Sequence, residues 1–503
     1  MKYFLILPLL FNAVFAQIKL PAIISDHMVL QQKSKVALWG WSKPAAMVSV
    51  KPSWINRAIY TTADAKGRFE IAVKTPAAGD SHEIEFVSGD TIVVHDVVMG
   101  EVWLASGQSN MEFFMGKTPN ASYTGEMNRE DALKDADLPL IRTIDVPNRV
   151  SNEPQNEFKA IWKICSPATL DTFSAVAFYF ARSIHKATGF PVGIINSTWG
   201  GTPAESWTKK EVLEGDPELS PILDRYEEQL KNYPELSKQY KLDAELWKAD
   251  TSKRKGPAPV APIGPTHNKS PYKLYNGMIA PLIPYTLKGA IWYQGESNVD
   301  RAFQYRTLFP AMIKQWRSDF KNEAMPFYFV QIAPHRSQSP EIRDAQLFTM
   351  NTVDHTGMAV ITDYGNANDI HPRNKKVVGE RLSLWALRYQ YGQKRIEYCG
   401  PRYIGMKISD NSIVLHFDHA AGLQALNGPL KEFTIAGDDQ KFIPANAVIE
   451  GTTIRVSAEG LSQPVAVRFA WSNVPQPNLY NGAGLPASPF KTDDWKQATE
   501  GKK

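Results

Sequence analysis

The feature that most constrains the fold is a set of five short apolar runs separated by segments with helical periodicity. The runs are Glu101–Ala105, Val192–Asn196, Gly289–Trp292, Phe327–Ile332 and Met358–Thr362. They are apolar along nearly their whole length, which is typical of parallel strands buried on both faces. Residues 173–189, 305–320 and 375–390 space apolar side chains three and four apart, as amphipathic helices do. This alternation predicts a flavodoxin-like, doubly wound α/β/α domain with a parallel sheet.

The rest of the chain predicts further modules, because 503 residues are too many for one hydrophobic core. Residues 17–98 and 399–503 hold short strand-like runs between Gly, Pro, Asp and Ser turns, which predicts a β-sandwich-like module on each side of the α/β domain at 99–398. A charged, helix-prone stretch with a proline-rich loop interrupts that domain at about 209–260. It is either a rim over the site or a solvated surface excursion.

The N-terminus has the pattern of a secretory signal. Lys2 precedes an apolar run at residues 3–15, and Val14 and Ala16 stand at the −3 and −1 positions of a cleavage site before Gln17. We therefore expect a signal peptide at residues 1–16 and a periplasmic or secreted protein. No later segment has the length of a transmembrane helix, so no stable membrane insertion is expected.

Charge and cysteine content exclude several functional classes. The net charge is only +4 and no block of Lys or Arg is present, so no nucleic-acid partner is expected. Cys165 and Cys399 are the only cysteines, which leaves open one disulfide or two buried thiols. No motif with metal-ligand spacing occurs. The oligomeric state is not readable from these features.

Each predicted strand is followed by small and polar residues. In a parallel sheet the carboxyl ends of the strands share one rim, where such folds bind their ligands. The segments that follow the strands are Gly107–Asn110, Ser197–Thr202, Gln294–Asn298, Pro334–Arg336 and Asn368–Pro372. Their convergence predicts an active site on this rim.

A serine, a histidine and an aspartate stand out in these segments. Ser109 is either a nucleophile or the N-cap of the next helix. His371 follows the last strand and is the preferred base among the ten histidines, although a plain loop histidine is the alternative. Asp369 either orients His371 as the acid of a triad, or has no such role, in which case the site is a Ser-His dyad. Asp363 is a weaker alternative acid.

An acyl-transfer site also needs donors aimed at the developing negative charge. The backbone N–H of Ser109 is one candidate, and an amide of Gly200 or Gly201 is a second. The side-chain amide of Gln294 or of Asn298 is the third. These donors would form an oxyanion hole.

The motifs in combination resemble those of a known family. They are Gly100–Met111, Asn196–Gly201, Leu274–Ile279, Trp292–Asn298, Asp369–Pro372 and Phe490–Trp495. With them, nearly the whole mature chain resembles the sialate O-acetylesterases of the SGNH/GDSL-type hydrolase superfamily. The resemblance implies that Ser109 attacks an acetyl ester, that His371 acts first as base and then as acid, and that no metal or organic cofactor takes part. The spacing Asp-x-His departs from the superfamily's Asp-x-x-His, and a Gln-Gly-Glu-Ser context replaces its usual asparagine.

The remaining polar residues on the rim have open roles. Gln108, Asn110 and Glu296 either support the Ser109 turn or contact substrate, and Glu296 is alternatively a glycosidase acid that lacks an identified partner. Arg343, like Arg336 and Arg373, either pairs with a sialate carboxylate or makes a surface ion pair.

The leading hypothesis is therefore an exported esterase that removes acetyl groups from sialic acids. Acetylated xylan or another plant glycan is the alternative substrate class. A non-catalytic glycan-binding protein that uses the two β modules is a rival from another functional class, and the presence of both Ser109 and His371 counts against it.

Overall fold

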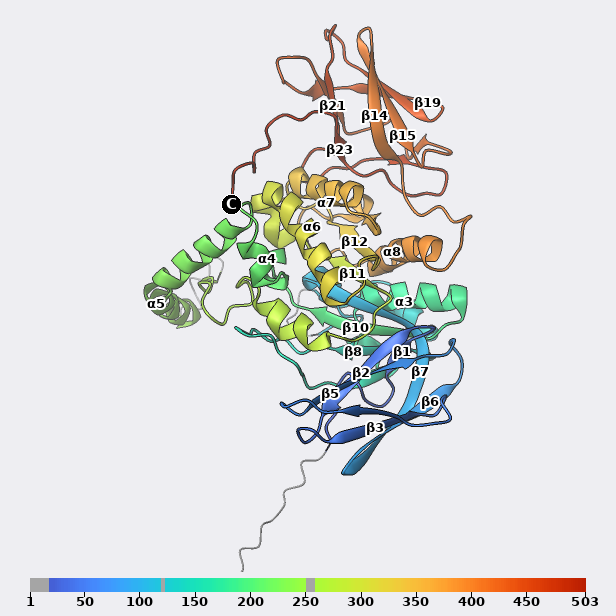
Figure 1. The fold of residues 1–503 in the computed structure, drawn as a ribbon. Coiled ribbons are helices and arrows are strands. Elements are labelled where there is room, and N and C mark those ends of the chain that lie inside the picture. The colour runs from blue at the N-terminus through green and yellow to red at the C-terminus, as the bar shows by residue number, and fades with distance from the viewer. Residues whose placement is uncertain (1–17, 119–122, 250–257) are drawn as a thin grey trace, which may run out of the picture.

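A computed structural model describes residues 18–118, 123–249 and 258–503 of the protein. The predicted signal peptide at residues 1–16 lies outside the described residues. A β module, an α/β domain and a second β module follow one another along the long axis of the molecule (Figure 1). The α/β class predicted from the alternation is confirmed.

One long strand links the first module to the α/β domain. β7 (Asp90–Gly107) has exposed and half-buried residues in its first half and is buried without interruption from Val97 to Gly107. This change in burial marks the point where the chain leaves an antiparallel sheet with one solvent-exposed face and enters a parallel sheet that is covered on both faces. The predicted boundary at residue 98 therefore falls inside a strand that both parts share.

The parallel sheet has the order β13-β12-β11-β7-β10-β8-β9, with β9 antiparallel to β8 at the edge. Apart from β7, its strands are β8 (Leu138–Asp145), β9 (Trp162–Cys165), β10 (Val192–Thr198), β11 (Gly289–Tyr293), β12 (Phe327–Gln331) and β13 (Thr356–Val360). The chain builds one half of the sheet after β7, and β11 then returns to the other side of β7. The carboxyl end of β7 thus lies at the topological switch point, where ligands bind in this class.

Helices cover both faces of this sheet. They are α3 (Ala175–Thr188), α6 (Ala302–Asp319), α7 (Pro340–Thr352) and α8 (Lys375–Tyr389), with the short α1 (Ser109–Glu112) and α2 (Arg129–Lys134) in the loops after β7. α3 packs on α8 over one face and α6 on α7 over the other (Figure 1). Ser174 begins α3 by accepting the Ala177 N–H, and Gly189 ends it in the left-handed conformation that favours glycine.

The N-terminal module shares its hydrophobic core with the α/β domain. Its strands are β1 (Val29–Gln31), β2 (Lys35–Trp41), β3 (Met47–Pro52), β4 (Ile59–Thr62), β5 (Arg68–Lys74) and β6 (Ser81–Ser88). β6 and β1 pair with β7, and β2 and β5 form a separate ribbon. One continuous apolar cluster runs from this module through the sheet to α8. The module is consequently an extension of the same core.

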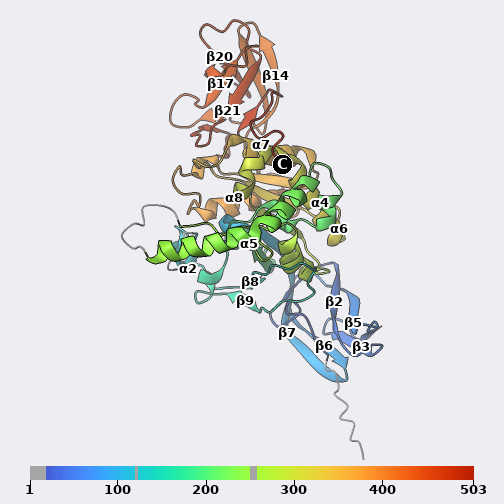
Figure 2. The same ribbon diagram turned by 90° about the vertical axis from the view of Figure 1, so that its left-hand side faces the viewer.

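The C-terminal module has a hydrophobic core of its own. Its strands are β14 (Arg402–Ser409), β15 (Ser412–Asp418), β16 (Gln424–Ala425), β17 (Phe433–Ala436), β18 (Ile443–Pro444), β19 (Asn446–Glu450), β20 (Thr453–Ser457), β21 (Ala466–Phe469), β22 (Leu479–Tyr480) and β23 (Phe490–Lys491). They form two four-stranded sheets and one short pair. This module packs beside α7, at the opposite end from the N-terminal module (Figures 1 and 2).

The insertion consists of α4 (Lys210–Glu214) and the 30-residue α5 (Ser220–Ala249). In α5 only Ile222 and Tyr226 are buried, and the rest of the helix projects from the body of the protein (Figures 1 and 2). The distal part of α5 is thus a solvated surface excursion, which is one of the two interpretations of this segment given above. Residues 253–257, the first part of the predicted proline-rich loop at 253–262, lie outside the described residues.

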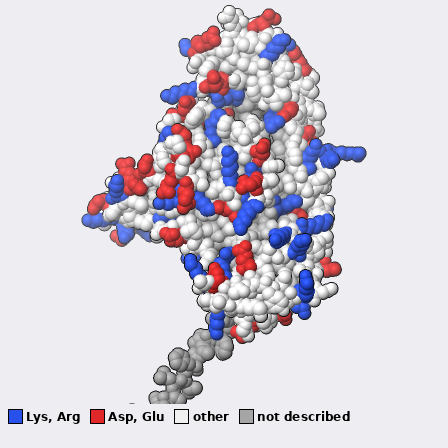
Figure 3. All heavy atoms as spheres, viewed as in Figure 1, with Lys and Arg blue, Asp and Glu red and all other residues white. Residues whose placement is uncertain are grey.

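Both cysteines are free and buried, which answers the question that the sequence left open. In the described part of the chain, no helix combines the length and the hydropathy that a membrane crossing needs. Lys and Arg lie among Asp and Glu over the face seen in Figure 3.

Candidate active site

Ser109 lies in a tight turn at the end of β7. Gly107 has φ +133°, and a Cβ there would lie 2.3 Å from the carbonyl oxygen of Tyr293 on β11, so only glycine fits. The register places Gly107 beside Thr198 of β10 and Tyr293 of β11. The loops that follow these three strands therefore begin at the same level and meet around Ser109.

The structure brings Ser109 and His371 together. His371 Nε2 lies 2.8 Å from Ser109 Oγ, within hydrogen-bond reach, although the residues stand 262 positions apart. Burial, and then the nearby Lys375 ammonium, lower the pKa of His371 to about 4. The imidazole is thus neutral at neutral pH and can accept the Ser109 proton, provided that Nδ1 carries the ring proton.

Asp369 approaches His371 only loosely. Its Oδ1 is 3.8 Å from His371 Nδ1, which is longer than a hydrogen bond, and 43% of its side chain is exposed. The same oxygen accepts the backbone N–H of His371 at 2.9 Å. Asp369 thus shapes the turn and places a partly solvated charge near the ring. The alternative acid, Asp363, is engaged in an ion pair with Arg381 of α8 at 2.7 Å.

The backbone candidates for the oxyanion hole differ in availability. The Ser109 N–H belongs to the first turn of α1 and has no intrahelical acceptor. The Gly200 N–H donates to Glu112 Oε2 at 2.6 Å, so a carboxyl group already occupies it. Gly201 has φ +73°, so the loop turns sharply at this residue. Gly200 is thus engaged, and Ser109 and Gly201 remain the candidate backbone donors.

The side-chain amides proposed as third donors are engaged elsewhere. Gln294 Nε2 donates to Asn298 Oδ1 at 2.7 Å and to Thr202 O at 3.2 Å. Asn298 Nδ2 donates to Glu205 Oε2 at 2.7 Å. Both residues are buried, at 0% and 2% exposure. They join the loops after β10 and β11, and neither amide is free to reach a substrate in this arrangement.

The turn that carries Ser109 is supported by three buried polar residues, Gln108, Asn110 and Glu296. Gln108 Oε1 accepts the Ser297 N–H at 3.3 Å. Asn110 Nδ2 donates to Glu296 Oε1 at 2.6 Å. Burial raises the pKa of the Glu296 carboxyl, which is only 7% exposed. This position beneath the turn does not suit a glycosidase acid, which must reach a glycosidic oxygen.

Arg343 is not placed to bind substrate, contrary to the expectation that it lies on the rim. Its side chain is fully buried in α7 and donates from Nη2 to the Ser472 carbonyl of the C-terminal module. The helix α7 was not among the expected elements, and this helix places Arg343 in the interior instead of on the rim. Arg373, by contrast, is exposed, and its Nη1 donates to Gly125 O at 3.4 Å.

Three residues near the site were not anticipated. Glu112 lies one turn after Ser109 in α1, and burial raises the pKa of its carboxyl to about 7. The Tyr123 ring lies 5.4 Å from the His371 ring. Lys375 is buried beneath Asn110. Only Glu112 carries a signal in the sequence, since a residue three positions after Ser109 shares its helix face.

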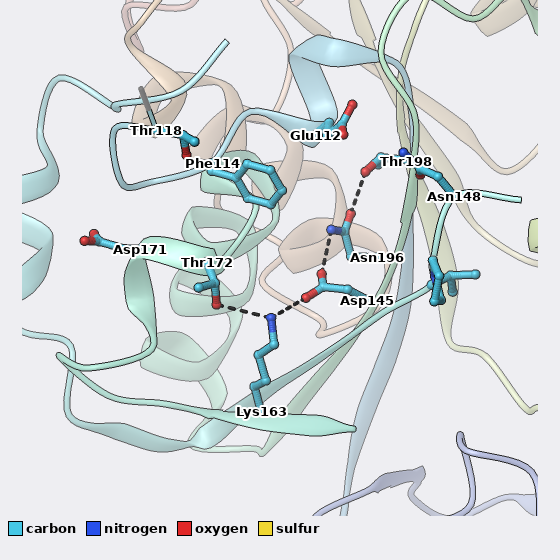
Figure 4. Close-up of a pocket in the computed structure, with 12 residues that line it drawn as sticks. Glu112, Phe114, Thr118, Asp145, Asn148, Lys163, Asp171, Thr172, Asn196 and Thr198 are labelled. Carbon is cyan, nitrogen blue, oxygen red and sulfur yellow. Dashed lines mark hydrogen bonds and ion pairs between the residues drawn. The ribbon is translucent and has the colours of Figure 1, made fainter. Parts of the chain in front are cut away.

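A polar pocket of about 370 Å³ lies beside the nucleophile turn, next to β10 and β8. Figure 4 shows Glu112 and Thr198 in the upper part of the view, and Asp145 with Lys163 below them. Asp145 accepts from Lys163 Nζ at 2.7 Å and from Asn196 Nδ2 at 2.8 Å. These side chains offer both donors and acceptors of the kind that recognise sugar hydroxyls.

Comparisons with known proteins agree on one kind of enzyme. The family described as carbohydrate esterase, sialic acid-specific acetylesterase, matches residues 265–382. The sialate O-acetylesterase of Mus musculus is 28% identical over 93% of this chain and 93% of its own length, and that of Homo sapiens is 27% identical over 93% and 91%. The crystal structure of a carbohydrate acetylesterase from Xanthomonas citri superposes with a TM-score of 0.80 and 34% identity, covering 95% of this chain and all of that chain (100%).

Proposed function

Because the chain belongs to the sialate O-acetylesterase family of carbohydrate esterases, we propose that it hydrolyses acetyl esters of sugars, with O-acetylated sialic acids as the substrate class. The observation that carries the proposal is the 2.8 Å contact between Ser109 Oγ and His371 Nε2 at the switch point of the sheet. A serine becomes a useful nucleophile when a neutral base accepts its proton, and this geometry supplies such a base.

The reaction proceeds through an acetyl-enzyme. Ser109 Oγ attacks the acetyl carbonyl carbon while its proton passes to His371 Nε2. The oxyanion that forms lies at the Ser109 and Gly201 amides. His371 then gives its proton to the sugar oxygen, the ester C–O bond breaks, and acetyl-Ser109 remains. A water molecule that loses a proton to His371 attacks this ester, and acetate leaves as Ser109 regains its proton.

One assay on three proteins tests the nucleophile. Acetate release from 4-nitrophenyl acetate is compared for the wild type, Ser109→Ala and Ser297→Ala. Ser297 is the matched control because it is a serine on the neighbouring loop, outside the Ser109–His371 contact. Ser109→Ala should lose at least about 10³-fold in kcat, as removal of a catalytic nucleophile does. Full activity in Ser109→Ala would refute the mechanism.

A neutral plant glycan, such as acetylated xylan, is the second candidate substrate class. It is favoured by the pairing of the pocket's charges: among the described lining residues the cation Lys163 is held by Asp145, and Asp171 is held by Arg129. No arginine is among the described residues that line it, so a sialate carboxylate would find little compensation there. Rates of acetate release from O-acetylated sialic acid and from acetylated xylo-oligosaccharides distinguish the two classes.

We also propose that the protein is exported. The support is the charged start, the apolar run and the small residues before Gln17. N-terminal sequencing of the protein recovered from the periplasm or the medium should begin at Gln17. Recovery of the uncleaved chain from the cytoplasm alone would contradict export.

A further inference from the structure

Lys375 occupies a position that is costly for a cation. It is the first residue of α8 and is completely buried, at 0% exposure. The N-terminus of a helix carries partial positive charge, and burial removes the water that stabilises an ammonium group. Burial lowers the pKa of Lys375 to about 7, and the nearby Glu296 and Asp369 carboxylates oppose that effect. A charge in so unfavourable a place needs specific partners.

Those partners lie next to the turn that carries Ser109. Lys375 Nζ donates to Asn110 Oδ1 at 2.5 Å and lies 4.7 Å from the Phe113 ring centroid and 5.2 Å from that of Tyr293. The aromatic faces stabilise the ammonium. Asn110 Nδ2 in turn donates to Glu296 Oε1 at 2.6 Å. The amide of Asn110 is thus held between a buried cation on its oxygen and a buried carboxyl group on its nitrogen.

The same amide reaches the loop that carries the base. Asn110 Nδ2 also donates to the carbonyl oxygen of Ile370 at 3.0 Å. Asn110 directly follows Ser109 in the chain, and Ile370 directly precedes His371. One side chain therefore ties the backbone next to the nucleophile to the backbone next to the base, and Lys375 and Glu296 fix the orientation of that side chain.

We propose that Lys375 is a positioning residue of this site: it holds Asn110, and through Asn110 the His371 loop, against Ser109, and its charge adds to burial in keeping the acidic limit of activity low. The proposal rests on the proposed esterase mechanism, since it assigns a partner to the Ser109–His371 pair. Lys375 does not touch the substrate in this role. Its effect passes through the orientation and the protonation of His371.

The charges that face His371 come from several elements. Lys375 on α8 and His335, which follows β12, lower the pKa of His371, whereas Asp369 in its own loop raises it, and burial is the largest effect. Tyr123 covers one side of the ring. Glu296 and Glu126 act on Lys375 and favour its protonated form. Lys375 is consequently charged in the acidic range where His371 titrates.

The decisive experiment is the pH profile of kcat/KM for 4-nitrophenyl acetate, whose acid limb reports the pKa of the base in the free enzyme. Lys375→Met removes the charge and keeps the length of the side chain. Lys376→Met is the matched control, because the next lysine is only half-buried and acts on Asp131 of α2. Lys375→Arg tests whether another cation restores the profile.

The expected result has two parts. In Lys375→Met the acid limb moves to higher pH by about half a unit or more, because the loss of a nearby cation makes the imidazole easier to protonate. Its kcat falls by about 10- to 100-fold with little change in KM, as expected when a reacting pair is misplaced. Lys376→Met keeps the wild-type profile, and Lys375→Arg lies closer to the wild type than Lys375→Met. A folded Lys375→Met with an unshifted acid limb overturns the proposal.

Two further measurements keep the proposal testable if Lys375→Met fails to fold. The acid limb of the wild type must lie below 6.5, the ordinary value for histidine, and a higher midpoint overturns the proposal. Asn110→Ala should lower kcat and leave the acid limb low, because the Lys375 charge remains.

An active Ser109→Ala variant would refute the esterase mechanism itself. An inactive Ser109→Ala together with an unshifted acid limb in Lys375→Met would refute only the role of Lys375.

Discussion

The loose contact between Asp369 and His371 leads to a quantitative prediction for Asp369→Asn. The substitution removes the negative charge, while the remaining amide oxygen can still accept the His371 N–H that Asp369 Oδ1 accepts at 2.9 Å. The turn should therefore persist. What is lost is the attraction between the carboxylate and the imidazolium that forms when His371 takes the Ser109 proton.

The size of that attraction follows from the 3.8 Å separation of Oδ1 and Nδ1. Two unit charges at that distance attract by about 1 kcal/mol in water and by about 4 kcal/mol at an effective dielectric constant of about 20. With 43% of its side chain exposed, Asp369 is screened by solvent and lies toward the lower limit. A loss of about 1–2 kcal/mol corresponds to a decrease in kcat of roughly 5- to 30-fold.

Steady-state hydrolysis of 4-nitrophenyl acetate measures this decrease, with circular dichroism as a check that the variant is folded. Asp369→Ala should lose more than Asp369→Asn, because it also removes the acceptor that shapes the turn. A buried, hydrogen-bonded triad acid contributes about 10⁴-fold. A loss of that size in Asp369→Asn would refute the reasoning and would mean that the carboxylate closes onto Nδ1 in the working enzyme.

Three other predictions concern buried or half-buried groups. The folded-state pKa of Glu112, about 7, is above its ordinary value of 4.5. Stability should therefore fall by up to about 3 kcal/mol as pH rises from 5 to 7.5, and Glu112→Gln should flatten this dependence in urea unfolding at the two pH values. Arg343→Met should leave KM for acetylated sugars unchanged, because Arg343 is buried against Ser472; a large rise in KM would return it to the site. Cys165 and Cys399 should resist a thiol reagent in the native protein and react after unfolding, since burial raises the pKa of both thiols to about 12; rapid labelling of the native protein would contradict their burial.

Five strands of the α/β domain were predictable because each carries its own signal, whereas β8 and β9 at one edge of the sheet were not among the predicted strands. The run at Val192–Asn196 became β10 (Val192–Thr198), and Gly289–Trp292 became β11 (Gly289–Tyr293). A strand buried on both faces must be apolar throughout, whatever its neighbours are. The helix α7 was missed because its apolar positions are few, and most of its buried residues are polar or charged, Arg343 among them.

The candidate site divides in a similar way. Ser109 and His371 could be found because each follows a strand, and the strand ends of a parallel sheet converge whatever the details of packing. The donors were harder to assign, because Gly200, Gln294 and Asn298 all have suitable groups. Their hydrogen bonds to Glu112, to Thr202 and to Glu205 are made across loops, and the order of residues does not show that these groups are already engaged.

The alternation of strands and helices, the shared rim of the polar loops and the residue types that carry acyl-transfer chemistry can all be derived from the order of the amino acids. These depend on short-range periodicity and on the direction of parallel strands. Which polar groups contact one another depends on the packing of the folded chain. Asn110 and Lys375 stand 265 residues apart and meet at 2.5 Å, because the order of the strands brings the end of β7 next to the start of α8. The solvent exposure of Asp369 and the burial of Lys375 likewise arise from packing. They set the electrostatics of His371, which no local pattern in the sequence records.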